Sequence, residues 1–238
     1  MTRPDALYSN FVKSESMSRA LLALALLAAV ASAQQKNAFK AAATCPDYDV
    51  LMTFYNSTQG PNWTRRHNWG STDCCDANTG WYGLNCDSAN NVIMITLPEN
   101  NLSGSFPEIL TKLTRLRVLN LALNNLSGVL PVSIAQWTEL EALTLFSNNL
   151  TGALPPCFGN FSRLQTLELF SNKFSGAFPK GIGLLENLTT MWVNDNLISS
   201  VDAAMPQPRS IFACDLSANP LRCPVPGWAA GSCAAVCS

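Results

Sequence analysis

The residue types that perform catalysis are sparse in this sequence. His67 is the only histidine, and no GxSxG or HxxxH motif occurs. Nucleophilic or metal-assisted catalysis would therefore depend on one imidazole. The closest carboxylate pairs, Asp47 with Asp49 and Asp73 with Asp76, have an ordinary explanation as capping and turn residues. We therefore expect no enzyme, no metal and no cofactor.

A second set of residues has the chemistry of binding. Large aromatic, acidic and amide side chains recur 23 or 24 residues apart in the second half of the chain. Aromatic side chains anchor protein interfaces, and carboxylates pair with basic groups of a partner. We expect these residues to bind a partner: Phe146, Glu168, Phe170, Trp192, Asn194, Asp195 and Asp215.

The elements that must position these residues form a repeat. Six asparagines lie 24 residues apart, except that the last interval is 23: Asn100, Asn124, Asn148, Asn172, Asn196 and Asn219. The three units that start at Leu116, Leu140 and Leu164 follow the frame LxxLxLxxNxLSGxxP closely, whereas the fifth repeat departs from it after Asn196, with Ser200 and Ala203 in place of the glycine and proline. A fixed period in this range indicates a solenoid, in which each unit buries its apolar face against its neighbours.

Within one unit, the alternation xxLxLxx predicts a short strand with one buried face. Each coil should therefore add one strand to a parallel sheet. The asparagine amide that follows can pair buried backbone groups of adjacent coils. The glycine of LSGxxP allows a backbone conformation that disfavours a Cβ, and the proline ends the extended piece.

This register places the binding set on the outer side of the sheet. The inward leucines already fill the core, so burial inside the coil does not account for Phe146, Phe170 and Trp192. Exposed aromatics with a polar rim mark interaction sites. The alternative is that Phe146 stacks on Phe170 to stabilise the sheet itself. A basic protein or peptide suits the acidic rim, and a glycan that stacks on Trp192 is the alternative partner. An ice-binding solenoid would need one hydroxyl residue in successive coils, yet Asn120 separates Thr96 from Thr144.

The motif from Val92 to Pro179 resembles the plant-type leucine-rich repeat, LxxLxLxxNxLSGxIP. That resemblance implies an α/β solenoid: a right-handed superhelix with a parallel sheet on the concave face and disulfide-bonded caps at both ends. The start CPD, the adjacent CC and the later WYGLNCD are most similar to polygalacturonase-inhibiting proteins, and they imply bridges from Cys45 to Cys74 and from Cys75 to Cys86. The ectodomains of leucine-rich repeat receptor kinases are also similar, so the resemblance implies an inhibitor of a secreted hydrolase or a role in cell-surface signalling or defence. Departures at GPNW and at residues 78–80 weaken any transfer of the inhibitor's partner.

The C-terminal segment NPLRCPVPGWAAGSCAAVC resembles a cap, and we expect a bridge from Cys223 to Cys233. Cys214 and Cys237 are then candidates for a second bridge, which leaves Cys157 as the odd thiol. Several pairings of this end remain open from sequence alone.

The N-terminus predicts export. Arg19, an apolar run from Ala20 to Val30 and the AxA site at residues 31–33 have the form of a secretory signal peptide, with either Met1 or Met17 as its start. All nine cysteines follow it, as expected of an oxidising compartment. Seven NxS/T sequons are candidate glycosylation sites: Asn56, Asn62, Asn101, Asn125, Asn149, Asn160 and Asn187.

We therefore expect a signal peptide at 1–33, an N-terminal cap at 34–91, six repeats at 92–219 and a C-terminal cap at 220–238. The net charge of −1 argues against a nucleic-acid partner. With no apolar run that could span a membrane after the signal, we expect a secreted monomer in the extracellular space or cell wall.

Overall fold

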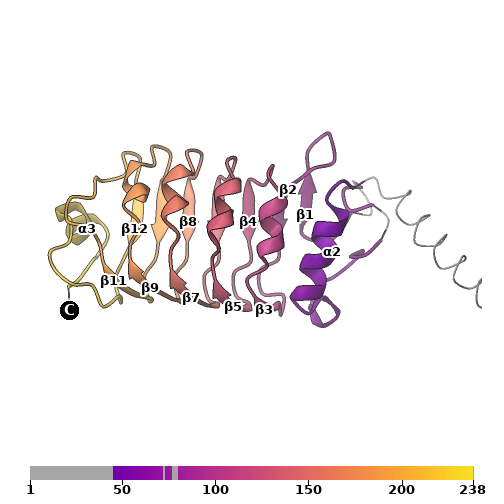
Figure 1. The fold of residues 1–238 in the computed structure, drawn as a ribbon, viewed down its shortest axis with the longest axis horizontal. Coiled ribbons are helices and arrows are strands. Elements are labelled where there is room, and N and C mark those ends of the chain that lie inside the picture. Colours follow the sequence, from indigo (N-terminus) through magenta and orange to yellow (C-terminus); the bar gives the residue numbers. More distant parts are fainter. Residues whose placement is uncertain (1–44, 72, 77–79, 238) are drawn as a thin grey trace, which may run out of the picture. The chain divides into compact units, whose positions relative to one another are not determined.

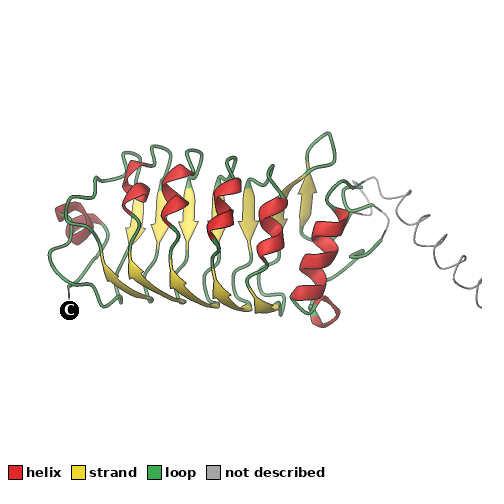
Figure 2. Ribbon diagram, viewed as in Figure 1, coloured by secondary structure: helices red, strands yellow, loops and turns green. Residues whose placement is uncertain are grey.

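The computed structural model describes residues 45–71, 73–76 and 80–237, which lie in one compact unit. The expected signal peptide at 1–33 lies outside the described residues. Within the unit the chain winds through successive coils, each with a strand on one side and a short helix on the other (Figures 1 and 2). No helix among the described residues is long and apolar enough to cross a membrane.

The first sheet is built from the xxLxLxx segments and has seven strands in the order β1-β2-β4-β6-β8-β10-β12. Strand β1 pairs with β2 in the antiparallel sense, and the coil strands that follow are parallel to one another. Its strands are β1 (Leu84–Cys86), β2 (Val92–Thr96), β4 (Val118–Asn120), β6 (Ala142–Thr144), β8 (Thr166–Glu168), β10 (Thr190–Trp192) and β12 (Ala213–Asp215). The parallel array confirms the predicted solenoid, whereas the antiparallel cap strand was not anticipated.

A second sheet shows that the expectation of one strand per coil was too low. The LSG segments pair with one another in the order β11-β9-β7-β5-β3, along one edge of the coils (Figure 2). Its strands are β3 (Ser103–Ser105), β5 (Asn125–Val129), β7 (Asn149–Ala153), β9 (Lys173–Ala177) and β11 (Leu197–Ser200). The sequence reads NLSGV or NLTGA here, and glycine with small polar residues is a weak strand signal.

The coils close through short 3₁₀ helices opposite the first sheet. These are η2 (Glu108–Lys112), η3 (Val132–Gln136), η4 (Pro156–Asn160) and η5 (Lys180–Leu184). Two glycines allow η4 and η5 to lie close together, because a Cβ added to Gly159 would lie 2.7 Å from the Cα of Gly181. Among the described residues, no such helix follows β11, where Ser200 and Ala203 replace the glycine and proline of the frame.

The ladder asparagines join one coil to the next as predicted. The Asn172 amide nitrogen donates to Leu145 O at 3.0 Å and Leu169 O at 3.2 Å, and its carbonyl oxygen accepts from Leu150 N at 3.0 Å. The same pattern recurs at Asn124, Asn148, Asn196 and Asn219. The residue before each ladder asparagine adopts a left-handed backbone, with φ of 50° to 56°: Glu99, Leu123, Ser147, Ser171, Asp195 and Ala218.

The core is one continuous apolar column inside the coils. The strand leucines are fully buried, as Leu143, Leu145, Leu167 and Leu169 show. Bulky residues from the 3₁₀ side fill the rest, including Trp137, whose indole N–H donates to Leu110 O at 3.1 Å. The inward-facing leucines therefore leave the outer side chains of the sheet to solvent.

The N-terminal cap covers the first coil with helix α2 (Tyr48–Ser57), the short η1 (Gly60–Asn62) and a cluster of aromatic rings. Trp63 and Trp81 are buried, and Trp69 lies between them with ring centroids at 4.8 and 4.9 Å. These tryptophans therefore pack as the cap's own small core. The Asn100 amide ties the cap to the ladder, since it donates to Arg65 O and accepts from Arg65 N.

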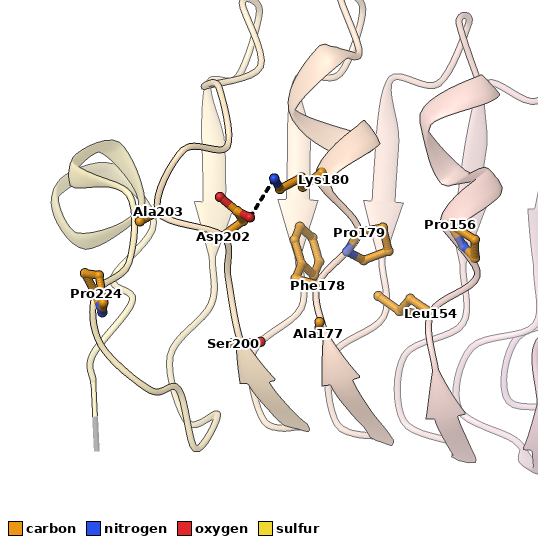
Figure 3. Close-up of a pocket in the computed structure, with 10 residues that line it drawn as sticks. All are labelled: Leu154, Pro156, Ala177, Phe178, Pro179, Lys180, Ser200, Asp202, Ala203 and Pro224. Carbon is orange, nitrogen blue, oxygen red and sulfur yellow. Dashed lines mark ion pairs between the residues drawn. The ribbon is translucent and has the colours of Figure 1, made fainter.

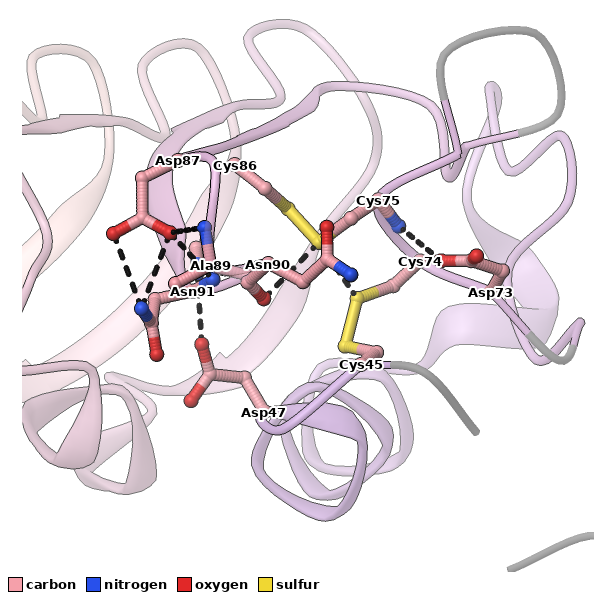
Figure 4. Close-up of a disulfide and its surroundings, with 11 residues drawn as sticks. Cys45, Asp47, Asp73, Cys74, Cys75, Cys86, Asp87, Ala89, Asn90 and Asn91 are labelled. Atoms are coloured by element: carbon pink, nitrogen blue, oxygen red, sulfur yellow. Dashed lines mark hydrogen bonds between the residues drawn. A yellow bond between two sulfur atoms is a disulfide. The ribbon is translucent and has the colours of Figure 1, made fainter. Parts of the chain in front are cut away.

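Two disulfides hold this cap, Cys45–Cys74 and Cys75–Cys86, with the pairing that the family resemblance implies (Figure 4). The helix-capping role expected of Asp47 is wrong, because its side chain makes no cap hydrogen bond. The carboxylate instead accepts from Val92 N at 2.8 Å and so joins α2 to the first coil strand. Burial raises the pKa of Asp47, although the bond from Val92 opposes that shift.

The C-terminal cap corrects the expected disulfide. The structure pairs Cys214 with Cys233 and Cys223 with Cys237, so the Cys223–Cys233 and Cys214–Cys237 pairings are wrong. Cys214 lies on β12, the last strand of the first sheet, and helix α3 (Gly227–Ser232) ends beside it at Cys233. The pairing follows from this contact between the end of the sheet and its cover, which residue spacing does not reveal. Cys157, in η4, is the free thiol, as expected, and is half-buried.

Candidate binding face

The candidate site lies on the outer surface of the first sheet, over β6, β8, β10 and β12. Phe146 and Phe170 follow β6 and β8, and their rings stack at a centroid distance of 4.3 Å with an interplanar angle of 8°. Trp192, on β10, meets the Phe170 ring edge-on at 6.2 Å. We call Phe146, Phe170 and Trp192 the aromatic patch.

The patch is partly covered and partly open. Phe146 and Phe170 are half-buried because each ring covers a face of the other, whereas the Trp192 side chain is 39% exposed. The stacking alternative is confirmed for Phe146 and Phe170, and partner binding stays a prediction. Stacking across strands stabilises the sheet, and Trp192 keeps an apolar surface that a partner could cover.

Acidic residues lie on both sides of Trp192. The strand register places Glu168 opposite it on β8 and Asp215 opposite it on β12. Neighbouring strands lie ~4.8 Å apart, so the indole has a carboxylate on either side. The Asp215 carboxylate accepts from Ser217 N at 2.8 Å, which fixes its position.

The two remaining predicted residues lie in the turn after β10. Asp195 is exposed and has the left-handed φ of 54° common to its column, so it belongs to the edge of the face rather than to the sheet. Asn194 is half-buried, and its backbone carbonyl oxygen accepts from Ser171 N at 3.2 Å. The structure thus brings the seven predicted residues onto one face and its edge. Ala122 and Thr144, at equivalent register positions of the first sheet and the turn after it, are buried.

The groups considered for catalysis lie in the N-terminal cap. His67 is exposed and lies edge-on to the Tyr82 ring at 6.3 Å. Asp73 accepts from Cys75 N at 2.9 Å, as a turn residue does. The sulfur atoms of Cys45, Cys74 and Cys75 lie close together, but each belongs to a disulfide and none is a free thiolate for a metal.

Sequence reasoning missed one hollow, of about 600 Å³, on the side opposite the binding face (Figure 3). Leu154 and Phe178 form its apolar wall, and Lys180 and Asp202 form an ion pair at 2.7 Å across it. It opens where the fifth coil lacks a 3₁₀ helix. The loss of the repeat frame at Ser200 and Ala203 is the sequence signal that could have indicated it.

Known proteins share the coil architecture. Residues 90–150 match the family model for the leucine rich repeat. This match agrees with the leucine-rich repeat solenoid that the structure shows. Over 75 residues, 32% of its length, it is 37% identical to a probable leucine-rich repeat receptor-like protein kinase of Arabidopsis thaliana, and it spans 7% of that kinase.

Solved structures extend the likeness to most of the chain. The BIR2 ectodomain from Arabidopsis thaliana is 26% identical with a TM-score of 0.66, over 77% of this chain and 98% of the other. A chain of the BIR3–SERK2 complex from the same plant is 27% identical with a TM-score of 0.59, over 74% of this chain and 95% of that one. The protein is therefore similar to receptor ectodomains in fold and in extent.

Proposed function

We propose that this protein is a secreted, non-enzymatic recognition protein that binds a basic protein or peptide on the outer surface of the first sheet, its concave face. The observation that carries the proposal is Trp192, which is partly exposed between Glu168 and Asp215 and continuous with the Phe146–Phe170 stack. Such an aromatic surface with a charged rim has the composition of an interaction site. Four disulfides support an oxidising, extracellular setting.

The relatives support the same class of partner. One similar structure is a complex of two proteins, BIR3 and SERK2, which fits a role in cell-surface signalling. The carboxylates beside Trp192 indicate a positively charged partner, because they favour lysine and arginine and disfavour an acidic partner such as pectin. The resemblance to polygalacturonase-inhibiting proteins makes inhibition of a secreted hydrolase a second form of the same activity.

The test compares a triple variant of the patch, Phe146→Ala, Phe170→Ala and Trp192→Ala, with the wild type in a pull-down from the native extracellular medium. The matched control is Val132→Ala, Leu184→Ala and Phe212→Ala, which removes three exposed apolar side chains outside the patch. We expect the patch variant to lose at least ten-fold of the captured partner, because interface anchors contribute about 2 kcal/mol or more each. Raised salt should weaken wild-type capture.

Equal capture by the wild type and the patch variant would exclude the concave face. Circular dichroism of both triple variants separates lost binding from lost folding. If mass spectrometry identifies a secreted hydrolase, an activity assay of that hydrolase with and without this protein decides between inhibitor and signalling roles.

A carbohydrate partner is the second candidate. Trp192 with a carboxylate on each side has the form of a site where a sugar ring stacks on an indole and its hydroxyls bond to the acids. A neutral cell-wall oligosaccharide should then quench Trp192 fluorescence in the wild type and leave the Trp192→Ala variant without that signal. A protein partner predicts no such saturable change.

A further inference from the structure

The edge where the second sheet begins differs between the early and late coils. Three sequon asparagines lie at one register position: Asn101, Asn125 and Asn149. Asn125 and Asn149 are the first residues of β5 and β7. The equivalent first residues of β9 and β11 are Lys173 and Leu197. Each of these five residues comes directly after a ladder asparagine, so we call the surface they form the ladder edge.

The serine or threonine of the sequon is present in all five coils, including the two that lack its asparagine. Residues 103, 127, 151, 175 and 199, two places after each position, are all serine or threonine. Two of these hydroxyls join adjacent coils, because Ser127 Oγ donates to Gly104 O and Thr151 Oγ1 donates to Gly128 O, both at 3.1 Å. Coil stacking thus accounts for the serine or threonine at this position. Whether a coil has a sequon therefore depends only on whether the residue after its ladder asparagine is also asparagine.

The sequon side chains are placed to carry sugars. Asn101 and Asn125 are exposed and Asn149 is half-exposed, whereas the ladder asparagines beside them are used inside the coil. The Asn101 amide donates to Asn62 O at 2.9 Å, and a glycosylated amide keeps one N–H that can still make this bond. Neighbouring strands lie ~4.8 Å apart, so glycans on successive coils would form a continuous screen.

The sequon column ends at Asn149, three residues after Phe146, and the edge without sequons adjoins the Phe170 and Trp192 part of the binding face. Leu197 is 53% exposed and lies in the same coil as Trp192 and Asp195. Lys173 is likewise exposed and follows Phe170 by three residues. A glycan on either residue would extend beside the aromatic patch.

We propose that N-linked glycans at Asn101, Asn125 and Asn149 screen the ladder edge of the first three coils, and that the bare edge at Lys173 and Leu197 is where a protein partner passes onto the aromatic patch. The proposal rests on the secretion and the concave-face binding proposed above, and it adds the direction of approach. The occupant is the basic protein proposed above, because Glu168 and Asp215 beside Trp192 complement its charge, and a partner that proves to be a short peptide would overturn this route.

The first experiment maps occupancy on the full chain secreted by a eukaryotic cell. Peptide N-glycosidase in ¹⁸O-water should mark all three column asparagines, and Asn101→Gln, Asn125→Gln and Asn149→Gln should each remove one gel-mobility step. Lys173→Asn and Leu197→Asn complete the sequons NFS and NIS, so each should add one step. If Asn101, Asn125 or Asn149 is unmodified, or if neither added sequon is glycosylated, the proposed column of glycans is wrong. Retention of the chain inside the cell overturns it as well.

The second experiment adds a glycan at residue 173 to block the bare edge and repeats the pull-down described above. Lys173→Asn should lose at least ten-fold of the captured partner, whereas Lys173→Asn with Ser175→Ala has the same asparagine without a sequon and should capture normally. Removal of the Asn125 glycan should leave capture unchanged or raise it. If the patch variant loses the partner but Lys173→Asn does not, the proposed direction of approach is wrong and binding on the concave face is still supported. If neither loses it, the concave face itself is wrong.

Discussion

The second to fourth coils and the fifth coil solve one folding problem in different ways. From Leu116 to Pro179 each coil repeats the frame, with a ladder amide, a left-handed glycine and a 3₁₀ helix. In the fifth coil Ser200 replaces the glycine, the β9–β11 register shifts, and no such helix follows in the described chain. Two disulfides lie just beyond it. Local hydrogen bonds thus stabilise the regular coils, and covalent links secure the end where the frame fails.

The largest effect that could break this comparison is removal of one ladder amide. Asn172→Ala should lower the free energy of unfolding by about 4 kcal/mol. It leaves the buried Leu150 N–H without a partner, at about 1–3 kcal/mol, and removes one amide donor each from Leu145 O and Leu169 O, at about 1 kcal/mol each. Lys173→Ala, at the exposed next residue, should change it by less than about 0.5 kcal/mol. Urea denaturation of both variants measures the difference. Similar losses would show that the ladder does not stabilise the coils.

Removal of the Cys214–Cys233 disulfide tests the other side of the comparison. Changing both residues to alanine should cost about 3 kcal/mol, because the closed loop has a sequence separation of 19. Cys157→Ser lies in a regular coil, keeps a donor near Val132 O and should cost about 1 kcal/mol or less. Peptide mapping without reduction must first recover a Cys214–Cys233 peptide. Recovery of a Cys223–Cys233 peptide would contradict the structure.

A smaller effect concerns the glycine that the fifth coil lacks. Gly152 has φ of 77°, and a Cβ there would lie 2.8 Å from a methyl group of Val129. Gly152→Ala should therefore cost about 2 kcal/mol, since the left-handed backbone alone costs an L-residue about 1–2 kcal/mol. Gly227→Ala, with nothing within 4 Å of the added Cβ, is the control and should be neutral. Thermal unfolding of the two variants settles whether the frame glycine is required.

The smallest effect is electrostatic and belongs to the fifth coil. The Lys180 ammonium beside Asp202 holds the pKa of that carboxyl below its usual value of 3.8. A depressed folded-state pKa means that the pair stabilises the protein above about pH 4, and this contribution is lost as pH falls through the folded-state pKa. Asp202→Asn should therefore lessen the acid sensitivity of unfolding at low salt. An unchanged slope of stability against pH would show that the exposed pair contributes nothing.

The parts that could be predicted from sequence are those that repeat. The leucine spacing predicted β4 to β10, and the asparagine column predicted amide links between coils, because burial and backbone pairing impose one residue type at one position. The aromatic patch followed from the same register. Its stacking at 4.3 Å was only an alternative, since a register assigns a face and not a ring orientation.

The features that could not be predicted are set by tertiary contact. The β3 to β11 sheet forms from glycine-rich segments whose strand propensity is low, so only stacking reveals it. The Cys214–Cys233 and Cys223–Cys237 pairs depend on how α3 folds over the last strand, and four cysteines allow three pairings. Asp47 was misjudged because its acceptor role is toward Val92, 45 residues away, rather than toward its own helix.

The link between Asn100 and Arg65 has a consequence for chain length. The N-terminal cap presents its Arg65 backbone to Asn100 much as a preceding coil presents its own backbone to the next amide. Each amide therefore needs only an immediate neighbour, whether cap or coil. Duplication or deletion of a whole 24-residue unit between Leu116 and Pro179 would leave each cap in contact with a complete coil. Gene rearrangement could therefore lengthen or shorten the solenoid without a change in either cap.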